Sequence, residues 1–121
     1  MYSMSGHVSS AAQATEFAEK MAANAHDIGL DGMDLDVEDS GTGADVQVGL
    51  YVLFWLIIGI GFKIALIKET RRLLGPDFQI TYTIPALTGQ IEPWRSTIVG
   101  TLEELDAVNV MAYDYYWTVG I

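Results

Sequence analysis

Apolar and polar positions follow two different periods along this chain. Helical spacing of apolar residues predicts three helices, and runs of β-favouring residues, one of them strictly alternating, predict three strands. The predicted helices cover residues 9–27, 62–76 and 95–105, and the predicted strands cover residues 33–38, 78–84 and 106–113. Helices and strands therefore alternate along the chain. This order indicates parallel strands joined by crossover helices, and therefore an α/β fold.

The first two helices have recognisable apolar faces and ends. Gly29 follows the first helix, and Gly75 with Pro76 closes the second, as expected of C-terminal stop signals. Pro85 ends the strand that follows. The residues predicted to face a core from these two helices are Ala14, Phe17, Met21, Ala25, Phe62, Leu66, Leu73 and Leu74.

Residues 46–67 are unusually apolar for a segment between strands. From Val48 to Ile67 the only charged residue is Lys63, which is the length of a membrane span, and basic residues follow it. Glycines and the flanking strands oppose a membrane helix. We therefore interpret residues 46–67 as an atypical hydrophobic insert or helix within one domain that covers residues 1–121.

The charge balance narrows the classes of partner. Sixteen acidic residues face six basic ones, giving a net charge of -10. This argues against nucleic acid and against anionic lipid, since both require a basic surface, whereas a neutral substrate fits. The chain has no cysteine, which excludes disulfides and thiolate metal sites. Its first ten residues lack the basic and apolar regions of a signal peptide.

Three carboxylates lie on one face of the predicted strand 33–38. Asp34, Asp36 and Glu38 alternate with apolar residues, so the pleat directs all three to the same side. In a crowded site one such group stays protonated and can donate to a leaving-group oxygen. The alternating aspartates also resemble a calcium loop, although the spacing of an EF-hand is missing. From this pattern alone, three interpretations remain open: a catalytic cluster, a metal site, or neither of the two.

Two segments resemble the signatures of one enzyme family. Asp31 to Glu38, DGMDLDVE, resembles the DGxDxDxE signature of family 18 glycoside hydrolases, the chitinase family. Met111 to Asp114, MAYD, resembles the second signature of that family, MxYD, on the sixth strand of its barrel. The strand between them resembles the fifth. The resemblance implies a partial TIM (β/α)8 barrel, approximately from the end of strand 3 through strand 6, since a whole barrel has about 250 residues.

The resemblance also implies roles for the three carboxylates. Glu38 would protonate the glycosidic oxygen and then activate water as the base. Asp36 would orient the N-acetyl group of the substrate, and Asp34 would share a proton with Asp36. The acetamido oxygen of the substrate serves as nucleophile, which gives retention of configuration without a second enzyme carboxylate. No metal and no cofactor is implied.

A substrate subsite follows from the same resemblance. Tyr113 would donate a hydrogen bond to the acetamido oxygen, and Asp114 and Met111 would line the same subsite. Tyr115 and Trp117 follow that strand and could stack on sugar rings, or could belong to a core or an interface. Trp94 is open to the same two interpretations.

These expectations define a function and its alternatives. The resemblance implies hydrolysis of β-1,4-linked N-acetylglucosamine polymers of the chitin type, with such an oligomer or polymer as partner and an extracellular location. The alternatives are a chitinase-like carbohydrate-binding protein, which would lack the acid glutamate, and an inactive barrel fragment. Open sheet edges predict self-association.

Overall fold

The computed structural model of the chain describes residues 11–37, 49–86 and 91–113, without the side chains of residues 49–58 and 91–93. Three helices alternate with three strands, as the sequence predicts. The elements are α1 (Ala11–Ile28), β1 (Gly32–Leu35), α2 (Gly49–Leu74), β2 (Gln79–Pro85), α3 (Ile91–Gly100) and β3 (Ala107–Met111).

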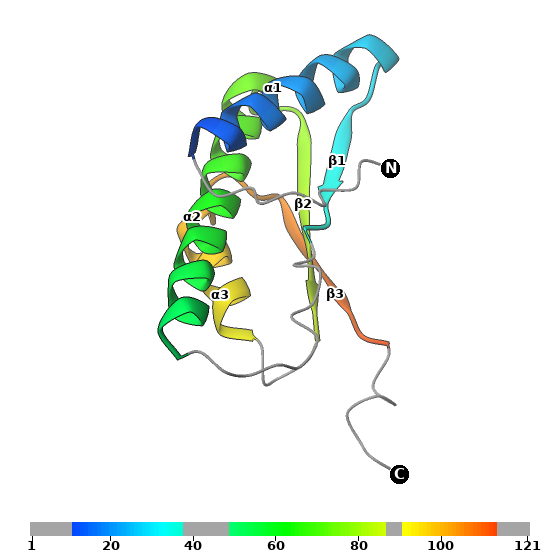
Figure 1. Ribbon diagram of the computed structural model, residues 1–121. Coiled ribbons are helices and arrows are strands. Elements are labelled where there is room, and N and C mark those ends of the chain that lie inside the picture. The colour runs from blue at the N-terminus through cyan, green and yellow to red at the C-terminus, as the bar shows by residue number, and fades with distance from the viewer. Residues whose placement is uncertain (1–10, 38–48, 87–90, 114–121) are drawn as a thin grey trace.

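The strands form one parallel sheet with the order β1-β2-β3. All three helices lie on the same side of this sheet, with α2 running beside the strands (Figure 1). No helix among the described residues covers the other side. The strands therefore direct buried apolar residues towards the helices and carry polar side chains such as Asp34, Thr81 and Asn109 on the opposite face, as in one part of the wall of a barrel.

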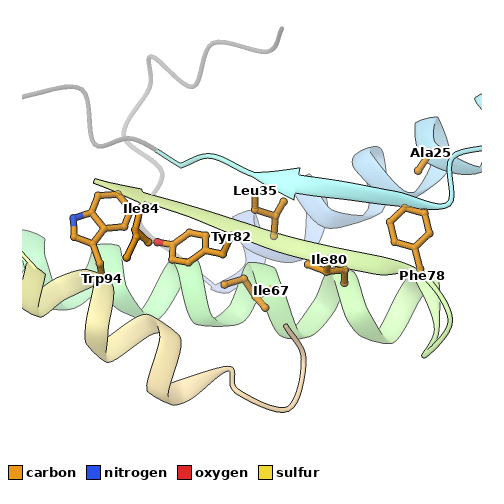
Figure 2. Close-up of a cluster of buried hydrophobic side chains, with 8 residues drawn as sticks. All are labelled: Ala25, Leu35, Ile67, Phe78, Ile80, Tyr82, Ile84 and Trp94. Atoms are coloured by element: carbon orange, nitrogen blue, oxygen red, sulfur yellow. The ribbon is translucent and has the colours of Figure 1, made fainter. Parts of the chain in front are cut away.

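The main core lies between the sheet and the helices. Ile80, Tyr82 and Ile84 alternate along β2 and point towards α2 and α3 (Figure 2). Trp94 of α3 meets Tyr82 with the ring centroids 5.9 Å apart, and the buried Lys63 ammonium lies 3.8 Å from the Trp94 ring centroid. Trp94 is thus a core residue, because its ring is covered by a tyrosine and by a cation.

A second buried cluster joins α1 to α2. It contains Ala14 and Ala18 from α1 with Phe62 and Leu66 from α2. Small alanines let the two helices approach closely, so the larger side chains of α2 fill the space between them. Val37, which the alternation in the acidic segment places opposite the carboxylates, packs against this cluster. Phe17, Met21 and Leu73 pack at its edge rather than in it.

Glycines close the first two helices, as the sequence predicts. Gly29 and Gly75 have φ values of 70° and 81°, in the left-handed region that disfavours other residues. The amide of Gly75 donates to the carbonyl of Arg71 at 2.9 Å, which satisfies one of the last carbonyls of α2.

Both predicted boundaries of the third helix are wrong. The third helix covers Ile91–Gly100 rather than residues 95–105. Pro93 does not prevent this start, because a proline in the first turn has no amide that the helix needs. The helix ends at Gly100, where a Cβ atom would lie 2.8 Å from Cδ1 of Ile64 on α2, and a turn follows.

The second helix begins well before Phe62. Residues 49–61 of the uncharged run are continuous with the predicted helix, so that α2 has 26 residues. None of the helices in the described part of the chain is both long and apolar enough to cross a membrane.

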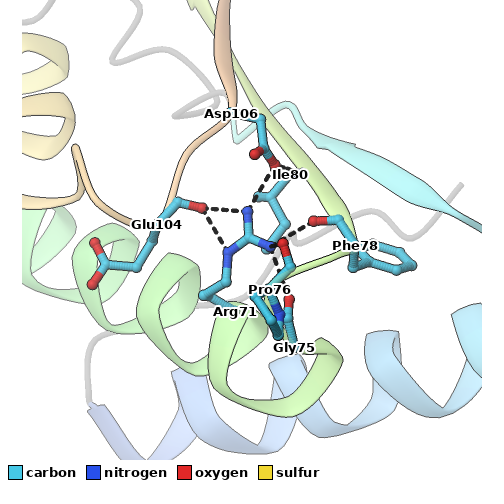
Figure 3. Close-up of polar contacts among 7 residues, drawn as sticks. All are labelled: Arg71, Gly75, Pro76, Phe78, Ile80, Glu104 and Asp106. Atoms are coloured by element: carbon cyan, nitrogen blue, oxygen red, sulfur yellow. Dashed lines mark hydrogen bonds and ion pairs between the residues drawn. The ribbon is translucent and has the colours of Figure 1, made fainter.

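Arg71 ties the end of α2 to the beginnings of β2 and β3 (Figure 3). Its guanidinium donates to the carbonyl oxygens of Glu104 at 2.7 and 2.9 Å, of Gly75 at 2.9 Å and of Phe78 at 2.5 Å. It also donates to the carboxylate of Asp106 at 2.7 Å, which in turn accepts from the Ile80 amide at 2.7 Å. This group fixes the end of the sheet opposite the carboxyl ends of the strands.

Candidate active site

The polar face of the sheet carries side chains from all three strands. In the parallel register Asp34 of β1 lies beside Thr81 of β2, and Thr83 of β2 lies beside Asn109 of β3. Their apolar neighbours along the strands, such as Leu35 and Tyr82, are buried on the helix side. The alternation of period 2 therefore gathers these polar groups on the face that would line the inside of a barrel.

Asp34 is the centre of this group. Its Oδ1 atom accepts hydrogen bonds from the Thr81 hydroxyl and from Nδ2 of Asn109, the latter at 2.9 Å. Its Oδ2 atom accepts from the Thr83 hydroxyl at 2.5 Å. Nδ2 of Asn109 also lies 3.3 Å from Oγ1 of Thr81, so that the donors are linked to one another. Both carboxyl oxygens are occupied as acceptors by groups from two neighbouring strands.

These contacts set the ionisation of Asp34. Partial burial raises its pKa, but the hydrogen bonds from Thr81, Thr83 and Asn109 together lower it by more. The pKa of Asp34 therefore lies below the ordinary value for an aspartate, and the group is a carboxylate at neutral pH.

The structure describes some of the other predicted site residues and not the rest. Asp36 is exposed and comes directly after β1, two residues beyond Asp34. Met111 is half-buried at the end of β3, and Tyr113 follows with 63% of its surface exposed. The remaining predicted residues lie outside the described residues: Glu38, Asp114, Tyr115 and Trp117.

Three residues of the site were not predicted: Thr81, Thr83 and Asn109. The sequence did contain a signal for them, since Thr81 and Thr83 alternate with apolar residues along a strand. Asn109 likewise interrupts two valines in the next strand. What the sequence lacked was the register that brings them beside Asp34.

The acidic segment does not form a metal site with the residues that are described. Within residues 11–37, 49–86 and 91–113, no group of three or more histidine, aspartate or glutamate side chains could hold a metal ion. Asp31, at the start of the segment, is exposed and contributes its backbone carbonyl, which accepts from the Gln79 amide at 2.9 Å. That bond aligns β1 with β2.

Comparison with known proteins places this sequence in a family. The sequence model described as Glycosyl hydrolases family 18 matches residues 3–119 of the chain, which is nearly its whole length. No curated protein and no solved structure matches the chain in the same comparisons.

Proposed function

Because the chain belongs to family 18 of the glycosyl hydrolases, we propose that it hydrolyses β-1,4-linked N-acetylglucosamine polymers of the chitin type. Membership of this family supports glycoside hydrolysis in general. The small parallel sheet with its helices agrees with part of a TIM-like barrel. The substrate and the mechanism are our proposal. The observation that carries them is the Asp34 carboxylate, held by three donors on the polar face of the sheet.

The proposed mechanism assigns the cleavage to Glu38. Glu38 donates a proton to the glycosidic oxygen, and after the leaving sugar departs it takes a proton from the attacking water. Asp36 orients the acetamido group, whose oxygen attacks the anomeric carbon, so that configuration is retained. Asp34 lies behind Asp36 on the same face and shares its proton. The alternation of Asp34, Asp36 and Glu38 with apolar residues in the sequence supports this order, because residues at period 2 in an extended chain share one side.

The substrate subsite is proposed at the end of β3. Tyr113 donates to the acetamido oxygen, while Met111 and Asp114 line the same subsite. Tyr115 and Trp117 stack on sugar rings. The position of Met111 and Tyr113 at the carboxyl end of a strand next to β2 supports this, since enzymes with this type of barrel place their sites at that end.

The three strands of the sheet correspond, in our proposal, to three consecutive strands of the family's barrel. We assign β1, β2 and β3 to the fourth, fifth and sixth strands of a domain that covers residues 1–121, with residues 46–67 as a hydrophobic helix or insert within it. Their parallel pairing in chain order supports the assignment.

The experiment is hydrolysis of a fluorogenic chitobiose substrate by the 121-residue chain and by its Glu38→Gln variant. We expect the variant to lose turnover by roughly 10²- to 10⁴-fold, because the amide cannot transfer the proton, while binding persists. Glu103→Gln is the matched control, since Glu103 is exposed in the turn after α3. Its turnover should equal that of the wild type.

The possible results of this experiment distinguish between the enzyme, a carbohydrate-binding protein and an inactive piece of the barrel. Turnover that survives Glu38→Gln contradicts the assignment of the general acid. Binding of chitobiose without hydrolysis by the wild-type chain favours a carbohydrate-binding role instead. Absence of both binding and hydrolysis is the outcome expected of an inactive piece of the barrel.

Self-association is a further part of the proposal. The outer edges of β1 and β3 lack a partner strand among the described residues, so their backbone donors and acceptors are available for pairing. A parallel sheet is ordinarily covered on both faces, whereas here the described helices cover one. We propose that a second copy of the chain pairs with one of these edges.

A further inference from the structure

The donors around Asp34 come from strands other than its own and are all neutral. Thr81 and Thr83 belong to β2, and Asn109 belongs to β3. Each presents a hydrogen to the carboxylate, and between them they occupy both of its oxygens. Neutral donors can stabilise the charge of Asp34 without adding a competing cation to the site.

From this geometry we propose that Thr81, Thr83 and Asn109 are positioning residues that hold Asp34 as the fixed, ionised member of its proposed pair with Asp36. The inference rests on the proposed function for its consequence in catalysis. The state of the Asp34 carboxylate itself can be measured without any substrate.

The direction of the hydrogen bonds supports this assignment. The Asn109 amide can only donate through Nδ2, and it donates both to Asp34 and towards Thr81. Thr81 therefore accepts from Asn109 and directs its own hydrogen to Asp34. Oδ1 of Asp34 already accepts two hydrogen bonds, so a proton on this oxygen would displace either Thr81 or Asn109. A proton on Oδ2 would require the Thr83 hydroxyl to turn and accept it, so that Thr83 would no longer donate to Asp34.

The surroundings of Asp34 bear on where the proton goes. Asp36, two residues further along the chain, is exposed and comes directly after β1. From β2 and β3 the side chains that contact Asp34 are the two threonines and Asn109. The helices lie on the other side of the sheet. Hydrogen bonds to the ionised form of a carboxyl favour that form, so these three donors keep the proton off Asp34.

The decisive measurement is the titration of the Asp34 side-chain carboxyl carbon by NMR in the 121-residue chain. We expect a midpoint below the ordinary aspartate value in the wild type and a higher midpoint in Thr83→Val, which removes one donor with almost no change of shape. Thr83→Ser retains the hydroxyl and should restore the low midpoint. Thr15→Val is the matched control, since the Thr15 hydroxyl on α1 donates to the Ala11 carbonyl and not to Asp34, and it should leave the midpoint unchanged.

A second variant protects the test against misfolding. Thr81→Val removes a different donor to Asp34 and should raise the midpoint in the same direction. The inference is overturned if the Asp34 midpoint is the same in the wild type, Thr83→Val and Thr81→Val.

The test also separates this inference from the proposed function. A chain that hydrolyses no chitobiose but shows the expected titrations refutes the proposed function and retains the positioning of Asp34. A chain whose hydrolysis depends on Glu38, with an Asp34 midpoint insensitive to both threonines, retains the function and refutes the positioning.

Discussion

At the scale of single residues, Arg71 shows how one side chain can supply hydrogen-bond donors to several backbone carbonyls at once. The turn after α2 and the turn before β3 both present backbone carbonyls that lie outside the regular ladders, and Arg71 donates to Gly75, Phe78 and Glu104 among them (Figure 3). The Ile80 amide and then the Arg71 guanidinium hold the pKa of Asp106 below its ordinary value. The flat, five-donor geometry of the guanidinium is what allows these simultaneous bonds.

Replacement of Arg71 by lysine should therefore destabilise the fold. The ammonium keeps the charge but cannot reach the carbonyls of Glu104 and Phe78 and the Asp106 carboxylate together. Carbonyls that lose a charged donor cost free energy, so we expect a loss of about 2 kcal/mol in the free energy of unfolding. Urea denaturation followed by circular dichroism measures it.

Arg72→Lys is the control for that experiment. Arg72, which is exposed, pairs with the half-buried Glu69 three residues before it on α2, and a lysine can keep such a pair. Its midpoint of unfolding should be close to that of the wild type. Equal midpoints for Arg71→Lys and Arg72→Lys would show that the bonds of Arg71 contribute nothing specific.

At the scale of elements, α2 is the helix around which the described chain is organised. Its second half contacts α1 through Phe62 and Leu66 and the sheet through Ile67. Helical spacing predicted two of these contacts, because residues three and four apart share a face. The start of α2 and both ends of α3 were missed, since the run of residues 48–62 has no periodicity and Pro93 is ambiguous without its position in the helix.

Truncation of Leu66 should separate α1 from α2. The side chain is fully buried between Ala14, Ala18 and Phe62, and alanines cannot move in to fill the space. We expect Leu66→Ala to lower the free energy of unfolding by about 2 to 5 kcal/mol, from lost burial and the cavity left behind. Thermal or urea unfolding measures the change.

Leu102→Ala makes the same chemical change at a position with 65% of its surface exposed. Its effect should be a small fraction of that of Leu66→Ala. If the two variants unfolded at the same denaturant concentration, the interface between α1 and α2 would not contribute to stability as the structure indicates.

At the scale of the whole molecule, the described chain has one covered and one open face of a small parallel sheet, with two open edges. Polar groups on the open face, including Asp34 and its donors, explain why that face tolerates water. The two edges of the sheet present backbone N–H and C=O groups without a partner strand among the described residues. The proposed pairing with a second copy would provide hydrogen-bond partners for these groups at one edge.

We therefore expect the chain to have a solution mass above the 13.3 kDa of one copy, as measured by light scattering after size-exclusion chromatography. Val110→Lys, which places a charge on the edge strand β3, should shift the mass towards one copy. Val99→Lys, at a similarly exposed position on α3, should not. A mass of one copy for the wild type at all concentrations contradicts the proposal.

The sequence by itself determined the alternation of helices and strands, the glycine ends of α1 and α2, and the opposite faces of Asp34 and Val37. These depend on the local period of the chain and on backbone preferences, so neighbouring residues contain enough information. The two signatures indicated the family, which the match over residues 3–119 confirms. Only the tertiary structure decided that Asp34 is surrounded by Thr81, Thr83 and Asn109. Those partners lie up to 75 positions away along the chain, and it is the pairing register of the strands that sets which side chains meet.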